Sequence, residues 1–352
     1  MLVAVSADYL WFPTLIKRGR ELLAVMSHQS DTYHATFTAM GAWSDDDGRH
    51  WTAPFAMPWG DGPFTLPNGA LQLLPFNLQT RDTSVDEFQS DAAFIEPNSR
   101  KVIAIPNGVS IGGLPARVAE IDKTTGRGIL RMNGDTVPLR DGGFLTTAYG
   151  RLEGDERRRT MVLASRDGRA WKYRPTVATA DTIPSGEGPT EASVCRLRDG
   201  RLMCVFRRAA YAAYGQAWSS DDGLTWTKPA AMKIGHSVQP SLITMADGTL
   251  VLSGGRPGIF IWLDFDGTGE RWQEVSLHAH HNAALPERQI PFIEKPKSSQ
   301  DMRTSSYTQV VALDERRLLV IYDYLPNGWL PLPPDSPQRN QVWCVEVTVE
   351  RN

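Results

Sequence analysis

The sequence predicts an all-β fold, a six-bladed β-propeller in which each blade is a four-stranded antiparallel sheet. Three observations predict it: a short strand hairpin recurs six times, a turn motif rich in Asp, Gly and Trp recurs between the hairpins, and helical periodicity is nearly absent. Turns at intervals of roughly 50 to 70 residues suit units of about four short strands. We therefore expect residues 1–352 to form a single domain.

The hairpins share the pattern Leu-x-Asp-Gly-x-Leu, in which a tight turn separates two apolar runs. Asp-Gly or Asn-Gly between such runs is the strongest short-range hairpin signal, because glycine adopts the positive φ that the turn requires. The clearest copy joins residues 194–197 to residues 202–206. In chain order the six turns lie at residues 17–22, 66–71, 139–144, 197–202, 245–250 and 313–318, and the first and last are looser copies.

The hairpin within residues 187–208 also carries charged side chains. Glu191 stands at the start of its first strand and Arg207 at the end of its second, so antiparallel pairing brings a carboxylate and a guanidinium to one edge of the sheet. The two groups could act together on a ligand or form a structural ion pair.

The two ends of the chain are predicted to pair in one blade. Residues 341–349 alternate between apolar and polar side chains, as a half-buried strand does. Residues 2–5 could pair beside them and close the ring of blades. Closure removes the exposed strand edges that an open sheet leaves.

A second motif, Ser-x-Asp-x-Gly-x-x-Trp, predicts further strand-to-strand turns. Residues 44–51 and 219–226 fit it, residues 165–171 are one residue shorter, and residues 264–272 are a degenerate copy. In each turn the Asp carboxylate is expected to accept backbone N–H bonds, the Gly to take a positive φ and the Trp to pack underneath. A carboxylate used in this way has little capacity left for a ligand, so we interpret these turns as architecture.

Composition and charge narrow the classes of partner. The formal net charge of −3 offers no argument for nucleic acid or an anionic membrane. No stretch approaches the roughly 18 apolar residues of a membrane span, and no leader precedes the first strand, so the chain as written is expected in the cytoplasm; a secreted protein trimmed of its signal peptide would look the same. Cys195, Cys204 and Cys344 have apolar neighbours and are expected as buried thiols, with a Cys195–Cys204 bridge as the less favoured alternative.

The Asp-rich turns at blade spacing, together with the Glu191 hairpin, resemble the sialidase (neuraminidase) superfamily, whose Asp-box or BNR repeats lie in a six-bladed propeller. The resemblance covers most of the chain and is weaker across residues 52–135. It implies an exo-glycosidase similar to a retaining exo-α-sialidase, which releases a terminal acidic sugar from a glycan or glycoconjugate. No cofactor or metal is implied, and we expect a monomer.

The resemblance also implies roles for five residues. Tyr307 matches the nucleophile, Glu191 its base, Asp31 the acid/base, and Arg207 and Arg256 two arms of a substrate-carboxylate clamp. A sialic acid carries a carboxylate on its anomeric carbon, which repels a carboxylate nucleophile but not a neutral phenol. A phenol, with a reference pKa near 10, is a weak nucleophile unless a base takes its proton. Sialidases with a Tyr nucleophile are therefore an exception to the two-carboxylate scheme of glycosidases.

One departure concerns the first blade. The family has an Arg-Ile-Pro-like run there, and this chain has Trp11-Phe12-Pro13. Loss of one charged hydrogen bond weakens binding by about ten- to a hundredfold. Arg151, which follows the third hairpin as Arg207 follows the fourth, could replace the missing arm, or Trp11 could stack on a sugar of different charge.

Several alternatives stay open at this stage. Tyr307 could be a packed aromatic residue, Asp31 could cap a turn, and His34 is a rival acid. His281 lies in the run 278–282, which lacks the spacing of a metal site. We instead expect this run in a loop over the propeller mouth, as a substrate-binding segment. A rhamnosidase or polysaccharide lyase that uses His34 or His280, and a carbohydrate-binding propeller without turnover, are the alternative functions.

Overall fold

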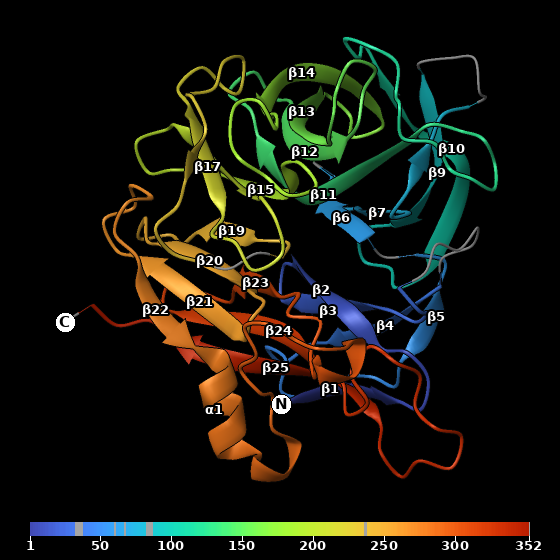
Figure 1. Ribbon diagram of the computed structural model, residues 1–352, viewed down its shortest axis with the longest axis vertical. Helices are drawn as coiled ribbons and strands as arrows, with labels where there is room; N and C mark the ends of the chain where they lie inside the picture. Colours follow the sequence, from blue (N-terminus) through green and yellow to red (C-terminus); the bar gives the residue numbers. More distant parts are fainter. Residues whose placement is uncertain (32–37, 60, 67, 82–86, 236–237, 352) are drawn as a thin grey trace. The chain divides into compact units, whose positions relative to one another are not determined.

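The computed structural model describes residues 1–31, 38–59, 61–66, 68–81, 87–235 and 238–351. His34 lies outside the described residues. The all-β prediction is confirmed, since strands dominate the described chain and its α-helix α1 spans only Leu277–Ala284 (Figure 1). The chain divides into two compact units, Met1–Pro58 with Gly235–Asn352 and Trp59–Ile234. The single-domain interpretation stays a prediction.

The first unit contains three four-stranded antiparallel sheets. Their strands follow one another along the chain, except that the N-terminal strand β1 joins the last sheet. The sheets are β2 (Trp11–Arg18), β3 (Glu21–Ser27), β4 (Ala39–Ser44) and β5 (Phe55–Met57); β19 (Ser241–Thr244), β20 (Leu250–Gly255), β21 (Ile259–Asp264) and β22 (Gln273–Ser276); and β23 (Gln309–Ala312), β24 (Arg317–Tyr324), β25 (Asn340–Thr348) and β1 (Leu2–Ser6).

The second unit contains one four-stranded sheet and one nine-stranded sheet. The four-stranded sheet comprises β15 (Thr190–Arg196), β16 (Leu202–Arg207), β17 (Gly215–Ser219) and β18 (Ala230–Ala231). The nine-stranded sheet has the order β6 (Asp61–Thr65), β7 (Leu71–Leu74), β9 (Phe88–Ile95), β10 (Val102–Gly112), β14 (Ala170–Ala178), β13 (Arg159–Ser165), β12 (Phe144–Gly150), β11 (Ile129–Pro138) and β8 (Leu78–Gln79).

The expectation of six separate blades is therefore corrected. The described chain has four separate four-stranded sheets, and the strands expected to make two further blades share the nine-stranded sheet. Its two antiparallel runs are joined by parallel pairing of β10 with β14, in which Ser110, Ile111 and Gly112 lie beside Ala170, Trp171 and Lys172. This contact joins segments about 60 residues apart, so the local turn pattern of the sequence carries no signal for it.

All six predicted hairpins are present. They are β2–β3, β6–β7, β11–β12, β15–β16, β19–β20 and β23–β24, each paired antiparallel. In the clearest copy Arg196 pairs with Leu202, and Gly200 in the turn has φ 88°. A φ of this sign costs glycine little, which explains why the Asp-Gly pattern located these turns.

The predicted pairing of the chain ends is also confirmed. β1 lies antiparallel to β25, with Leu2 beside Trp343 and Ser6 beside Asn340. Apolar residues of both strands, such as Val3 and Cys344, pack into one buried cluster with residues of β2 and β3. The N-terminal strand therefore covers the edge that β25 would otherwise leave exposed.

The Asp-rich turns have the expected geometry. In residues 219–226 the Ser219 hydroxyl donates to Asp221 Oδ1 over 2.8 Å and accepts the Gly223 N–H, while Asp221 Oδ1 accepts the Thr225 N–H. Gly223 has φ 82°. The same bonds recur in residues 44–50 and 165–169, so these carboxylates serve the backbone of their own turns.

These hydrogen bonds predict an acid-sensitive contribution to stability. Bonds from the Thr225 hydroxyl and N–H lower the pKa of Asp221 to about 2, from an ordinary value of 3.8. Because the folded pKa is the lower one, the stabilisation is complete above about pH 4 and is lost as the pH falls through about 2. Asp221→Asn is expected to lower the thermal midpoint at pH 7 by about 2 °C, and by less at pH 2.5.

Circular dichroism melts at both pH values measure this difference. Asp335→Asn changes an exposed aspartate in the segment between β24 and β25 and is the matched control. A pH-independent difference between wild type and Asp221→Asn would contradict the assignment.

Candidate functional site

Arg256 and Tyr307, two of the predicted site residues, lie together in the first unit. The Arg256 guanidinium carbon is 5.7 Å from the ring centroid of Tyr307 and 4.7 Å from that of Trp329. Its Nη2 donates to the Ser305 carbonyl over 2.8 Å, and Arg256 is only 7% exposed. The guanidinium is thus held against two aromatic rings, a favourable arrangement for a partly desolvated cation.

Phe12, rather than Trp11, contacts the Tyr307 ring. Phe12 is half-buried, and its ring meets Tyr307 edge-to-face with centroids 4.8 Å apart. Trp11 is 1% exposed and donates its indole N–H to the Gln29 carbonyl. This burial does not fit the sugar-stacking role expected of Trp11, because a buried ring presents no face to a ligand; Phe12 and the half-buried Trp329 present theirs instead.

Asp323 is a buried carboxylate that the sequence analysis did not assign. It is 0% exposed and accepts hydrogen bonds from Thr304 Oγ1 at 2.8 Å, Ser305 N at 2.7 Å, Ser305 Oγ at 2.5 Å and Phe12 N at 3.1 Å. Burial raises the pKa of Asp323, and these bonds offset part of that rise. Asp323 thereby ties the Phe12 segment to the segment that precedes Tyr307. The sequence signal that could have identified Asp323 was the presence of an acidic residue within the apolar run of β24.

Two of the predicted site residues, Glu191 and Arg256, have positive φ, at 37° and 70°. Phe12 and Ser306, which lie next to the predicted residues Trp11 and Tyr307, have φ 47° and 63°. Positive φ is uncommon for non-glycine residues and persists only where the surrounding structure enforces it, often at functional sites.

Glu191 and Arg207 meet in the second unit, as the hairpin predicted. Thr190 pairs with Arg207 and Ala192 with Phe206, so Glu191 is the extra residue of a β-bulge. A bulge re-aims a side chain relative to the regular alternation of a strand. Arg207 Nη1 donates to Glu191 Oε1 over 2.7 Å, and both side chains are largely buried.

The ion pair extends into a network of alternating charges. Arg207 Nη2 lies 3.0 Å from Glu187, whose other oxygen accepts from Arg158. Arg158 and Arg131 both donate to Glu120. Burial alone would raise the pKa of Glu120, but the hydrogen bonds and charges of these two arginines outweigh it and hold that pKa below its ordinary value.

The region that contains two of the Asp-rich turns matches a known family of repeat domains. The BNR repeat-like domain family matches residues 116–318, which include the turns at 165–171 and 219–226. The chain belongs to the BNR repeat-like domain family. No match was found among curated proteins.

Solved structures share the fold of this BNR repeat-like chain. A protein of unknown function from Dyadobacter fermentans is 18% identical with a TM-score of 0.67, covering 97% of this chain and 96% of that one. Hadza microbial sialidase Hz136 is 13% identical with a TM-score of 0.63, covering 96% and 66%. Trypanosoma rangeli sialidase is 16% identical with a TM-score of 0.60, covering 96% and 54%. The chain thus spans about two thirds and about half of these two sialidases, and the similarity shows a sialidase-like, propeller-like fold.

Arg151 does not lie beside Arg207, as a replacement for the missing arm of the carboxylate clamp would. It is exposed, and its Nη2 donates to the Ala119 carbonyl over 3.0 Å. Arg158, not Arg151, shares a carboxylate with Arg207. The only sequence signal for the role of Arg158 was the run of three arginines at residues 157–159. That run does not indicate which of the three side chains points inward.

The segment around His281 is helix α1 rather than the expected loop. The Ser276 side chain caps its first turn by accepting from Ala279 N. His281 is 1% exposed; its Nε2 donates to the Arg288 carbonyl over 2.8 Å, and its Nδ1 accepts from the Tyr322 hydroxyl. Burial lowers the pKa of His281. With both ring nitrogens bonded inside the protein, His281 does not fit the substrate-binding role.

Two catalytic assignments of the sequence analysis stay predictions. Asp31 is exposed and lies directly before residues 32–37, outside the described chain. Glu191 belongs to the second unit and Tyr307 to the first, so their pairing is also a prediction.

No helix among the described residues is long and apolar enough to cross a membrane.

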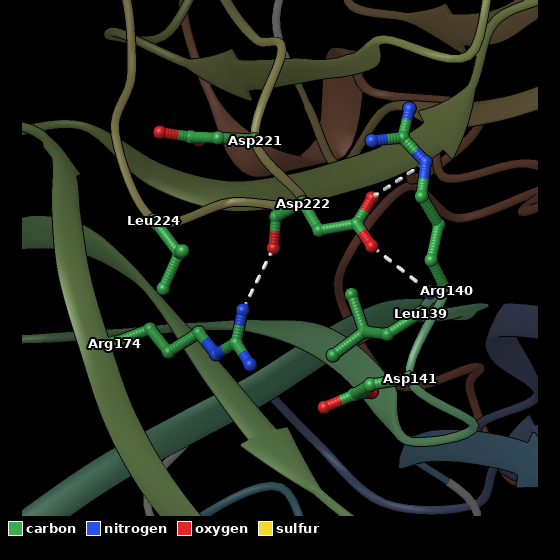
Figure 2. A pocket seen from close by; sticks show the side chains of 7 residues that line it. All are labelled: Leu139, Arg140, Asp141, Arg174, Asp221, Asp222 and Leu224. Atoms are coloured by element: carbon green, nitrogen blue, oxygen red, sulfur yellow. Dashed lines mark hydrogen bonds and ion pairs between the residues drawn. The ribbon is translucent and has the colours of Figure 1, made fainter.

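A surface pocket of about 300 Å³ lies in the second unit (Figure 2). The hairpin turn after β11, the Asp-rich turn after β17 and Arg174 line it. Asp222 accepts from Arg140 N and from Arg196, and its carbonyl accepts from Arg174. Both arginines that line the pocket thus bond to Asp222, as expected of packed turns.

Proposed function

We propose that this chain is a retaining exo-glycosidase that releases a terminal acidic sugar from a glycan. The observation that supports it best is the contact of Arg256 with Tyr307, because a cation beside a phenol ring suits both an anionic substrate and a developing phenolate. The sialidase-like fold supports the same class of chemistry.

In this proposal Tyr307 attacks the anomeric carbon while Glu191 takes its proton. Asp31 protonates the leaving oxygen and then activates the water that releases the sugar. Arg207 and Arg256 bind the sugar carboxylate through charge-assisted hydrogen bonds. Phe12 and Trp329 offer half-buried rings to the less polar part of the substrate.

Hydrolysis of an aryl α-sialoside by the wild-type protein tests the proposal. We expect release of the aryl group, no release from the aryl α-L-rhamnoside, and α-configured sugar as the first product in proton NMR. A β-configured first product would contradict the retaining mechanism. Rhamnoside cleavage alone would favour the changed-chemistry alternative, and sialoside binding without product would favour a carbohydrate-binding protein.

A further inference from the structure

Glu187 bridges two arginines of the second unit with one oxygen each. Arg158 Nη1 donates to Oε2 over 3.1 Å, and Arg207 Nη2 lies 3.0 Å from Oε1. Two guanidinium groups that converge on one carboxylate have the geometry of an anion site. In this structure the anion is a side chain of the chain itself.

Each of the two arginines also has a carboxylate of its own. Arg207 pairs with Glu191 at 2.7 Å, and Arg158 donates to Glu120 twice, at 3.0 and 2.8 Å. Arg131 donates to the same Glu120. Glu187 is thus one of three carboxylates that these three guanidinium groups share. Another anion in its place would keep the same two charge-assisted contacts with Arg158 and Arg207.

Glu187 is the carboxylate that can leave most easily. Its side chain is 40% exposed, against 9% for Glu191 and 17% for Glu120. Ion pairs of a partly exposed carboxylate contribute little to stability, so the exchange of Glu187 for another carboxylate costs little. Its backbone stays in place, because the Glu187 carbonyl accepts from Arg158 N and the adjacent Gly188, with φ 101°, lies so close to Arg158 that a Cβ would meet its carbonyl oxygen at 2.1 Å.

We propose that Arg158 and Arg207 form a binding site for the carboxylate of an acidic sugar, and that Glu187 occupies this site until the ligand displaces it. The exchange replaces one carboxylate by another and leaves the charge of the set unchanged. Arg158 thereby supplies a second guanidinium group, beside that of Arg207, for the sugar carboxylate. The assignment of the anion to an acidic sugar rests on the proposed function; the two-arginine site rests on its own geometry.

Binding of N-acetylneuraminic acid, measured by isothermal titration calorimetry, tests the site. Glu187→Gln removes the competing charge, so we expect the dissociation constant to fall by about tenfold. The C-1 methyl ester of the sugar, which has no carboxylate, should show no such gain. Weaker or unchanged binding by Glu187→Gln would overturn the proposal, because Glu187 would then only hold Arg207 in place.

A second pair of variants keeps the test independent of Glu187. Arg158→Lys retains the charge but loses the planar fork, and we expect binding to weaken by about tenfold. Arg159→Lys is the matched control, because Arg159 is also largely buried and paired, with Asp155, but does not touch Glu187. Equal losses in both variants, with thermal midpoints matched, would overturn the role of Arg158.

Failure of this site and failure of the proposed function are distinguishable. Tighter binding by Glu187→Gln in a protein that hydrolyses no sialoside would support the anion site and refute the glycosidase. Hydrolysis by the wild type together with weaker binding by Glu187→Gln would support the glycosidase and refute the displacement. Absence of binding to N-acetylneuraminic acid and D-glucuronate in every variant would refute the site.

Discussion

Tyr307→Phe is expected to reduce hydrolysis of an aryl α-sialoside by at least about 10³-fold, because the variant lacks the attacking oxygen. Affinity for the sugar should change little. The phenylalanine ring can keep the contacts that Tyr307 makes with Arg256 and Phe12, which involve the ring and not the hydroxyl. Steady-state kinetics and calorimetric binding separate the two effects.

The matched control is Tyr324→Phe. Tyr324 lies in β24 and packs near His281, so the variant removes a hydroxyl outside the Arg256 cluster. Incubation of the wild type with a 2,3-difluorosialic acid should attach the sugar to the peptide that contains Tyr307, as mass spectrometry would detect. Activity that persists in Tyr307→Phe but disappears in His280→Ala would exclude Tyr307 as the nucleophile and favour the histidine-dependent alternative.

Asp323→Ala is expected to cost about 3 kcal/mol of unfolding free energy and about a hundredfold in kcat. The stability loss follows because Phe12 N, Thr304 Oγ1 and both donors of Ser305 lose their buried acceptor. The rate loss follows because the same bonds position the segment before Tyr307 and the Ser305 carbonyl that holds Arg256. Urea unfolding and kinetics on the fully folded variant measure the two quantities.

Asp264→Ala provides the comparison for Asp323. Asp264 is also 0% exposed and accepts backbone N–H bonds from Gly269 and Glu270, in a turn after β21. Its loss should lower stability without changing kcat. Asp323→Asn, which retains one acceptor oxygen, should recover part of the activity. A kcat for Asp323→Ala equal to that of wild type would show that Asp323 is purely structural.

The features that were predictable from the sequence are those whose hydrogen bonds close within a few residues. The hairpin turn at Gly200 and the turn at Asp221 carry their donors, acceptors and glycines in one short segment. The Glu191–Arg207 contact was predictable for the same reason, since the register of one hairpin brings both residues to the same edge. Helix α1 was missed, because eight residues are too few for a 3.6-residue periodicity to emerge.

The remaining features depend on segments that are far apart in the chain. Parallel pairing of β10 with β14 merges two expected blades, and Asp323 reaches Phe12 from the other end of the sequence. The run of residues 157–159 does not show that Arg158, rather than Arg151, meets Glu187. The hydrogen bonds and the φ angles of a turn depend on neighbouring residues, so the amino-acid order alone specifies the hairpins and their spacing. Which charges are buried together depends on how distant strands pack, because the free energy of an ion pair is set by its distance and burial, and neither is encoded locally.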